Sequence, residues 1–285
     1  MSYTTTEHPP WVHDMTAYLQ PYWDRVLDST CVDGIARGVL SVEQMRAWMS
    51  QLYPFIHAFP KFLGEGLTKV EDDMSRNFFC DNIRVEKRHA DHWVTMGIGF
   101  GASKQEMIDL ADGIKPTMRD VQSLSDWLWY INARGTLAEA VAATSYAIEG
   151  VTGDISRKIL PALAHYEGRP GTQIEKRTWT WMREHAKYDD DHPKIALEII
   201  KRYATTPEIQ RRCMFAARRS LQLLDQALDV SVRAYTPLEE LEDRPDFSNG
   251  ANRRARLERR ASASVIPFPD RRFRERRGIN YELVA

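Results

Sequence analysis

Three residues in one short segment have the types and the spacing of metal ligands. The segment EHAKYDDDHP, residues 184–193, contains His185, Asp189 and His192. On a helix of about 3.6 residues per turn, offsets of four and then three residues bring these side chains onto one stripe. Burying two imidazoles and a carboxylate together costs free energy unless a cation lies between them. The segment therefore predicts one wall of a metal site.

Two other stretches offer further ligands of the same kind. Glu86 and His89 form an E-x-x-H pair, a spacing at which a carboxylate and an imidazole on one helix can share a metal. His92 follows three residues later and is less well placed. Glu149, in SYAIEG, is predicted near a helix C-terminus, where the helix dipole disfavours negative charge. A nearby cation would compensate that charge, and an exposed glutamate is an equally good explanation.

The combined set of candidate ligands holds three carboxylates, three imidazoles and no cysteine. Its members are Glu86, His89, Glu149, His185, Asp189 and His192. Mixed nitrogen and oxygen ligands suit iron or manganese better than structural zinc. The alternative is a set of surface charges with ordinary, satisfied histidines. Ferritin-like di-iron proteins carry two E-x-x-H motifs, and because this chain offers one, that fold is not predicted.

The elements that must position these residues are predicted to be helices. Capping boxes at 41–44, 103–106 and 136–139 each predict a helix start. The predicted helices cover about 11–27, 41–60, 72–97, 103 onward, 117–133, 136 to Gly150 or Gly153, 172–192 and 206–235. Thr172 is expected to cap the helix that carries His185, and Pro193 to kink or restart it. Strand patterns are scarce, so we expect an all-α bundle of roughly seven to nine helices.

Composition indicates a folded domain followed by a basic segment. The chain has 285 residues, and a hydrophobic content of 43% is enough for a large core. Residues 250–285 hold ten arginines and four acids, a formal charge of +6, which leaves −7 on the rest of the chain. We therefore expect one domain over residues 1–237. Residues 238–285 are expected to be a linker and an Arg-rich, flexible tail.

The cysteines and the hydropathy pattern predict a cytoplasmic protein. Cys31, Cys80 and Cys213 are odd in number and far apart, which argues against a disulfide framework. We see neither the apolar region of a signal peptide nor an apolar run near the ~20 residues of a transmembrane segment. The arginines of the tail could attract nucleic acid or an anionic membrane. A disordered tail, or one that docks on the acidic domain, is the simpler expectation.

The order of the motifs resembles the haem-oxygenase-like di-iron oxidases and oxygenases. An E-x-x-H pair, a glutamate in YAIEG and the pattern H-x-x-x-D-x-x-H follow one another along the chain. The stretches 82–94, 142–153 and 185–200 are similar to the UndA-type fatty-acid decarboxylases, which form 1-undecene. The similarity covers about residues 10–235 and leaves the Arg-rich tail outside.

This resemblance implies a fold, a cofactor and a set of ligands. The fold would be a haem-oxygenase-like (TenA- and PqqC-like) seven-helix bundle without haem, binding two Fe(II) per subunit with O₂ as co-substrate. The primary iron ligands and catalytic residues would be Glu86, His89, Glu149 and His185. Asp189 and His192 would help to hold a second, more labile iron. Where relatives carry an acid, this chain has His57, so the second site either lacks a ligand or uses His57 in its place.

The resemblance also implies a reaction. A medium-chain fatty acid would lose the hydrogen at C3 and then CO₂, leaving a terminal 1-alkene. An external electron donor would be a partner, and a homodimer is compatible with this expectation. An apolar tunnel would bind the chain, because each buried CH₂ gains about 0.8 kcal/mol. Its candidate walls are Tyr53, Phe55, Phe59, Trp127, Trp129 and Tyr146. For each of these aromatic residues, core packing is the simpler role.

Other functions share these ligands or this fold. The first alternative is a di-iron oxidase or oxygenase that acts on an amino acid or amine, by N-oxygenation or C–C cleavage. Basic residues near the metals would favour it, and Lys87 and Arg88 are expected to point away from the ligand face. The thiamin-degrading branch uses a cysteine nucleophile, and no cysteine lies among the motifs. A non-enzymatic binding or regulatory protein is suggested by the Arg-rich tail alone.

Overall fold

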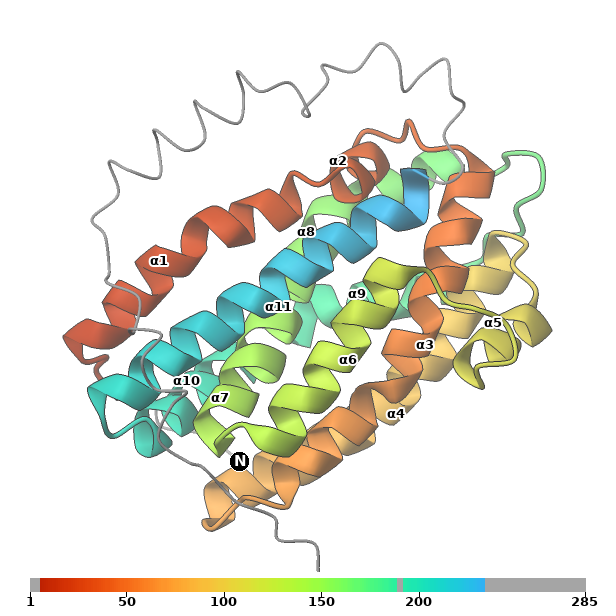
Figure 1. Cartoon of the computed structure of the whole chain (residues 1–285). Helices are drawn as coiled ribbons and strands as arrows, with labels where there is room; N and C mark the ends of the chain where they lie inside the picture. The colour runs from red at the N-terminus through yellow and green to blue at the C-terminus, as the bar shows by residue number, and fades with distance from the viewer. Residues whose placement is uncertain (1–5, 189–191, 234–285) are drawn as a thin grey trace, which may run out of the picture. The chain divides into compact units, whose positions relative to one another are not determined.

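The computed structural model describes residues 6–188 and 192–233, and every regular element in these ranges is a helix (Figure 1). The α-helices are α1 (Pro10–Leu27), α2 (Thr30–Ala36), α3 (Val42–Leu67), α4 (Asp73–Gly99), α5 (Lys104–Ala111), α6 (Arg119–Arg134), α7 (Leu137–Val141), α8 (Gly150–Ile159), α9 (Thr180–Tyr188), α10 (His192–Tyr203) and α11 (Pro207–Arg233). A π-helix, η1 (Ala142–Glu149), joins α7 to α8, and two 3₁₀ segments, η2 (Leu160–Tyr166) and η3 (Lys176–Trp179), precede α9. The predicted all-α class is confirmed.

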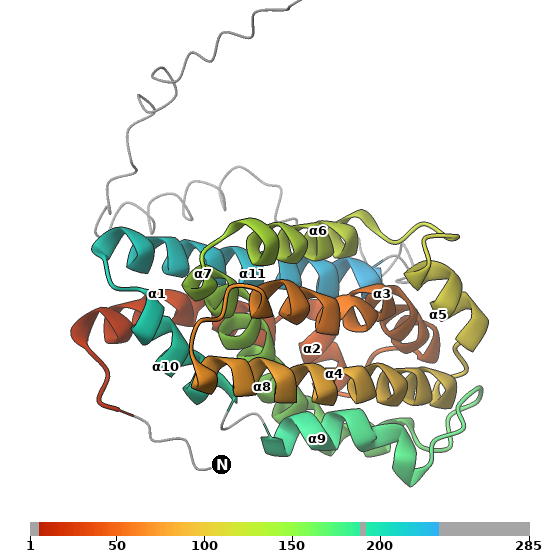
Figure 2. The same ribbon diagram turned by 90° about the horizontal axis from the view of Figure 1, so that it is seen from below.

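Helices α3 and α4 form the long antiparallel pair on which the interior is built. Figure 2 shows α4 lying between α3 and α9, and α11 running beside α6. The largest fully buried side chains come mainly from this pair and include Trp48, Phe62, Phe79 and Trp93. The α4 residues that face this core therefore lie under two neighbouring helices. The described residues all belong to the first of the two units into which the chain divides, Met1–Thr236.

The predicted helix bounds agree best with the structure where a capping residue or a regular spacing of apolar residues marks the helix. Helices α1, α4 and α6 begin and end within two residues of the expected positions, and α5 begins within two residues of its expected start. Helix α3 continues to Leu67 through Pro54 and Pro60, where the prediction ended it at the second proline. Phe55, Phe59, Phe62 and Leu63 are buried on this stretch. Their packing offsets the hydrogen bonds that the two prolines remove.

Two further predicted helix limits are wrong, for separate reasons. The chain does not start a helix at Thr172, because the backbone N–H of Gln173 donates to the carbonyl of Gly99 at 2.7 Å. The chain also does not stop at Gly150 or Gly153, both of which are buried in a helical path that continues to Ile159. A Cβ on Gly150 would lie 2.6 Å from Cη2 of Trp23. This glycine permits a close approach of two helices and does not end one.

The described residues contain eleven α-helices where seven to nine were expected. The short helix α2 was missed, and the helix predicted from residue 136 is divided into α7, η1 and α8. None of the described helices is long and apolar enough to cross a membrane. The predicted linker and tail, 238–285, lie outside the described residues.

The N-terminus of α4 is held by Asp72. Its carboxylate accepts hydrogen bonds from the backbone N–H of Ser75 at 3.1 Å and from the Tyr203 hydroxyl at 2.7 Å. It also lies 3.0 Å from Arg202. Burial acts to raise the pKa of Asp72, but the hydrogen bonds from Ser75 and Tyr203 and the charge of Arg202 hold it below its usual value. The cap is therefore expected to be fully formed at neutral pH.

We expect Asp72→Ala to lower the free energy of unfolding by about 1 kcal/mol, within the range of roughly 0.5–2 kcal/mol for a lost N-cap. Because the folded pKa is lowered, this contribution is present above the unfolded pKa and is lost as pH falls through the folded pKa. Urea denaturation of wild type and variant at neutral and acidic pH measures both effects. Asp72→Asn keeps the cap and serves as the control. A difference that grows on acidification would contradict this assignment.

Candidate metal centre

One face of α4 carries three buried polar side chains one turn apart. Asn82, Glu86 and His89 are 1%, 6% and 5% exposed. Nδ1 of His89 lies 3.0 Å from Oε1 of Glu86, a separation that two ligands of one ion also have. Lys87 and Arg88 are exposed, as expected. The E-x-x-H pair thus points into the interior between α4 and α9.

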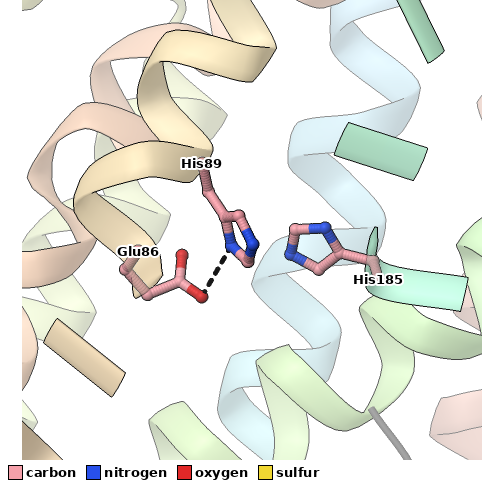
Figure 3. Close-up of side chains that lie close together, drawn as sticks. All are labelled: Glu86, His89 and His185. Carbon is pink, nitrogen blue, oxygen red and sulfur yellow. Dashed lines mark hydrogen bonds and ion pairs between the residues drawn. The ribbon is translucent and has the colours of Figure 1, made fainter. Parts of the chain in front are cut away.

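Helix α9 adds a second imidazole to this pair. His185 is 5% exposed, and its ring lies 4.2 Å from the ring of His89. Nδ1 of His185 donates to the carbonyl oxygen of Trp181 at 2.8 Å, which leaves Nε2 with a free lone pair. The Trp181 indole stacks on the same imidazole at 3.8 Å. Glu86, His89 and His185 each offer a ligand atom within 4.8 Å of the others (Figure 3).

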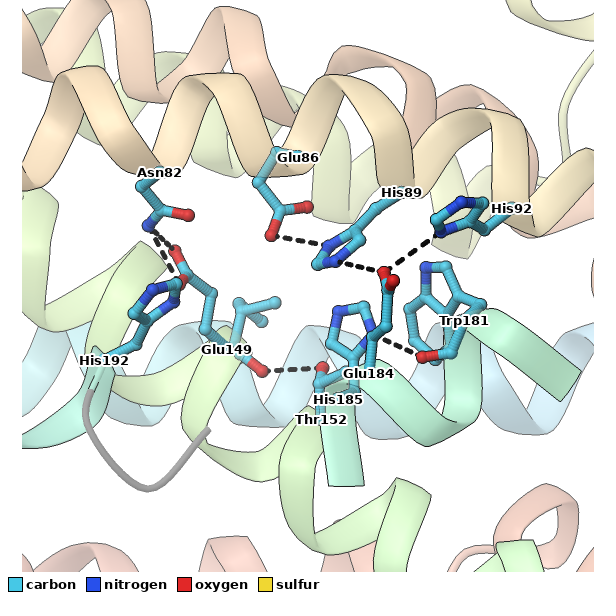
Figure 4. Close-up of polar contacts among 11 residues, drawn as sticks. Asn82, Glu86, His89, His92, Glu149, Thr152, Trp181, Glu184, His185 and His192 are labelled. Carbon is cyan, nitrogen blue, oxygen red and sulfur yellow. Dashed lines mark hydrogen bonds and ion pairs between the residues drawn. The ribbon is translucent and has the colours of Figure 1, made fainter. Parts of the chain in front are cut away.

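Glu86, His89 and His185 form one donor group, and a second polar group lies beside it. Glu149 ends η1 and is 5% exposed. Nδ2 of Asn82 donates to both of its carboxylate oxygens at 2.9 Å, and Nδ1 of His192 lies 3.2 Å from Oε2 (Figure 4). The ring of His192 also packs edge-on against Phe78. Glu149 therefore links α4 to the start of α10.

The π-helical turn accounts for the position of Glu149. All eight residues of η1 are buried, and the helix continues as α8 after Glu149. The expectation that this glutamate opposes a helix dipole is therefore wrong, since no helix ends there. The cost of the charge comes instead from burial. π-helical insertions are uncommon and are frequent at functional sites.

Glu86 and His89 each stabilise the charged form of the other. Burial acts to raise the pKa of Glu86, but the charge and hydrogen bond of His89, with a smaller effect from His185, hold it below its usual value. Burial likewise acts to lower the pKa of His89, and the carboxylate of Glu86 outweighs it, so that this pKa is raised. Burial and the charge of His89 lower the pKa of His185 to about 3. His185 is thus neutral at physiological pH, the form that binds metals.

The pKa of Glu149 is raised, whereas that of Glu86 is lowered. Burial raises the pKa of Glu149, and the hydrogen bonds from His192 and Asn82 only partly offset that rise. Proximity to the Glu86 charge raises it further. Two buried carboxylates that disfavour each other's charge are stabilised by a cation between them.

The predicted stripe of His185, Asp189 and His192 on one helix is not what the structure shows. Helix α9 ends at Tyr188 and α10 begins at His192, so the two histidines lie on different helices. Pro193 lacks an N–H and favours the first turn of a new helix, which explains the start of α10. His192 accordingly contacts Glu149. Asp189 lies outside the described residues.

Two other histidines have contacts of their own. Nδ1 of His57 lies 3.5 Å from the hydroxyl of Tyr53 on the same helix, and His57 is not in the donor group. Nδ1 of His92 lies 3.0 Å from Oε2 of Glu184. That same oxygen is 3.5 Å from Nε2 of His89, so Glu184 contacts the donor group from its outer side (Figure 4).

Of the six aromatic residues expected to line a tunnel, Tyr146 lines a cavity among the described residues. Tyr146 and Trp23 line a cavity of about 420 Å³ between α1, η1 and α8. Phe55 and Phe59 pack against Phe62, and Trp129 packs on the same ring from α6. The other two make side-chain contacts away from that cavity, Tyr53 with His57 and Trp127 with Ser220.

Three residues of the site were not predicted from the sequence. Asn82 shares the i, i+4, i+7 spacing of Glu86 and His89, so the same rule that found the pair would have included it. Trp181 lies four residues before His185 and so faces the same side of α9. Glu184 gave no signal, because its contact with α4 depends on how α9 packs.

The residues present fit a bound iron. The donor group offers one carboxylate and two imidazoles, all buried, with no thiolate among them. Such mixed ligands suit iron. The buried Oδ1 of Asn82 has no hydrogen-bond partner among the described residues, so it is free to face a bound cation.

Comparison with known families agrees with this chemistry. Residues 46–225, more than half of the chain, match the family Haem_oxygenas_2, which is described as iron-containing redox enzymes. The chain belongs to this family. The matched range contains Glu86, His89, Glu149 and His185, together with His192.

Individual relatives are more distant. A 4-aminobenzoate synthase of Chlamydia trachomatis is 24% identical over 170 residues, which cover 58% of this chain and 69% of that enzyme. The bifunctional coenzyme PQQ synthesis protein C/D of Methylorubrum extorquens is 24% identical over 206 residues, 70% of this chain and about half (52%) of that protein.

Solved structures show the same fold. A TenA homolog from Pseudomonas syringae pv. tomato has a TM-score of 0.71 and 27% identity, covering 82% of this chain and all of that one. A domain with a heme oxygenase-like fold from Shewanella denitrificans has a TM-score of 0.65 and 17% identity, covering 79% and 93%. The expected haem-oxygenase-like fold is therefore confirmed.

Proposed function

We propose that this iron-containing redox enzyme is an O₂-dependent oxidative decarboxylase that converts medium-chain fatty acids to terminal 1-alkenes and CO₂. The observation that carries the proposal concerns charge. Among the described residues, the hydrogen bonds and ion pairs of Glu86, His89, Glu149 and His185 involve no lysine or arginine. A substrate carboxylate would therefore be bound by the metal. A fatty acid has no second polar group that needs a partner.

Each described residue has a definite part in this proposal. Glu86, His89 and His185 would hold one iron. Glu149 was expected among the primary ligands, but its contact with His192 favours placing it at a second iron, where Asp189 is also expected to help. Bound iron would supply the activation of O₂ and the removal of a hydrogen atom from C3 of the acid. The acid loses two electrons as alkene and CO₂ form, and an external donor supplies the two further electrons that reduce O₂ to two waters. The buried donors exclude bulk water from this step.

The cavity beside η1 provides room for an acyl chain. Its volume of about 420 Å³ lies within the usual range for small-molecule sites, roughly 300–1,000 Å³. Part of its wall is apolar (Leu19, Trp23, Leu27 and Tyr146), and the rest is polar (Thr16, Gln20 and Asp154). Tyr146 precedes Glu149 by three residues on η1, and Trp23 touches Gly150. The walls of this cavity do not include Glu86, His89, Glu149 or His185, so it supports the proposal only by offering room for an apolar chain.

An oxidase acting on an amino acid or amine is the second candidate. It is favoured by the likeness to proteins named 4-aminobenzoate synthase. Asp154, in the wall of the same cavity, could pair with an ammonium group. That carboxylate already accepts hydrogen bonds from Trp23 and Arg157, which makes it less available.

The cysteine chemistry of the thiamin-degrading branch is not supported. Burial raises the pKa of the Cys31 thiol well above its ordinary value and that of Cys213 to about 12. Neither thiol would form the thiolate that a nucleophile requires. Cys80 is exposed and is not part of the donor group.

Headspace analysis tests the proposal directly. The protein is loaded with Fe(II) without oxygen, then given a reductant, O₂ and one of a series of medium-chain free fatty acids. We expect the 1-alkene one carbon shorter than each accepted acid, and none from protein without metal. O₂ uptake triggered by an amino acid or amine, with no alkene from any acid, would transfer the assignment to the second candidate.

A further inference from the structure

Asn82 has two polar ends, and the described contacts use one of them. Nδ2 donates to both oxygens of Glu149 at 2.9 Å, while Oδ1 is buried without a hydrogen-bond partner among the described residues. This assignment of the amide follows from its neighbour, because carboxylate oxygens accept and do not donate. Leaving a buried acceptor without a partner destabilises the fold, because its contact with water is lost and not replaced. A group that supplies the missing contact would recover that free energy.

The unpartnered oxygen lies between two acids. Figure 4 shows the Asn82 nitrogen directed to Glu149 and its oxygen on the side of Glu86, one turn further along α4. Both carboxylates are buried, and Nδ1 of His192 lies at the edge of Glu149. A neutral carbonyl oxygen among carboxylates and an imidazole is a suitable neighbour for a hard cation.

We propose that Asn82 is a positioning residue for the metal position served by Glu149 and His192. Its Nδ2 fixes the orientation of the Glu149 carboxylate, and its Oδ1 faces the cation held there. The inference rests on the metal-binding part of the proposed function and is independent of the substrate. An amide performs both tasks without charge, since a third carboxylate would repel Glu149 and an apolar side chain would leave it with one partner fewer.

The chain offers a matched control in Asn132. This residue is also 1% exposed, and its Oδ1 also has no partner among the described residues. Its Nδ2 donates to the carbonyl of Leu128 and to the hydroxyl of Thr144, and neither is an acid. Replacing Asn132 removes the same buried group and leaves the contacts of Glu149 unchanged.

Anaerobic titration with Fe(II) alone tests the inference in wild type, Asn82→Leu, Asn82→Asp and Asn132→Leu. Partners of this kind contribute about 10–100-fold in metal affinity, so the second equivalent should bind more weakly by that factor in Asn82→Leu. The first equivalent should be unchanged in all four proteins. The absorption bands of Co(II)-loaded protein should change in Asn82→Leu and not in Asn132→Leu.

The variant Asn82→Asp tests whether Oδ1 contacts the cation or whether Asn82 only supports the fold. It keeps an oxygen facing the cation, so it should bind the second equivalent more tightly than Asn82→Leu. Equal loss in these two variants would refute the role of Oδ1, and wild-type binding in Asn82→Leu would refute the inference as a whole. A wild type without a second equivalent would also refute it. Absence of alkene, with the second equivalent still lost in Asn82→Leu, would refute the proposed substrate alone.

Discussion

His185→Ala is expected to weaken Fe(II) binding by more than about 100-fold, because even outer partners of metal ligands contribute about 10–100-fold. The variant removes the neutral imidazole whose free Nε2 faces Glu86 and His89. The remaining two ligands both come from α4. Two ligands from one helix do not enclose an ion, so tight binding depends on the imidazole from α9. Equilibrium dialysis against Fe(II) without oxygen measures the loss.

His13→Ala is the control for this prediction. His13 is exposed on α1 and is not in the donor group, so its loss should leave Fe(II) affinity unchanged. Because His185→Ala also removes a buried ring that stacks on Trp181, its melting temperature without metal should fall, and Fe(II) binding should be compared well below both unfolding transitions. Equal Fe(II) binding by wild type and His185→Ala would show that the ion is held elsewhere.

Local spacing explains why part of the site was predictable from the sequence. Glu86 and His89 lie on one helix, and the rule that places residues i and i+3 on one face requires nothing from the rest of the fold. The same rule applies to Asn82. It failed for His185 and His192, because α9 ends at Tyr188 and a new helix, α10, begins at His192. A spacing rule holds only where the helix is continuous.

Contacts between distant segments could not be predicted in this way. Nothing local in SYAIEG indicates a π-helix, and the bond between Glu149 and His192 joins residues 43 positions apart. The contact of Glu184 with His89 depends on the packing of α9 against α4. The aromatic residues show the same limit, because composition identifies Phe55 and Tyr146 as apolar without saying which one borders a cavity.

The donor group rests on a column of aromatic rings. Trp181 stacks on His185, and Trp93 packs edge-on against Trp181 with ring centres 4.8 Å apart. Trp48 packs edge-on against Trp93 at 5.2 Å, and the Trp93 indole donates to the carbonyl of Met49 at 2.8 Å. The column runs from α3 through α4 to α9. It therefore joins the stability of the core to the position of a metal ligand.

Trp93→Ala is expected to lower the free energy of unfolding by about 3–5 kcal/mol, the usual cost of truncating a large buried aromatic residue. Trp93 is 1% exposed, and its loss would leave a cavity between Trp48 and Trp181. A domain is stabilised by only about 5–15 kcal/mol in total, so a large part of the stability depends on this ring. Urea denaturation of both proteins without metal measures the difference.

Trp129→Ala is the matched control, because Trp129 is 38% exposed and packs on Phe62 outside the column. Its loss should lower the free energy of unfolding clearly less than Trp93→Ala does. Below the unfolding transition, Trp93→Ala should also bind Fe(II) more weakly than Trp129→Ala, since Trp181 would no longer be held against His185. Equal losses of stability in the two variants would show that the column is ordinary packing. Equal Fe(II) affinities would show that the ligand is positioned by its bond to the Trp181 carbonyl alone.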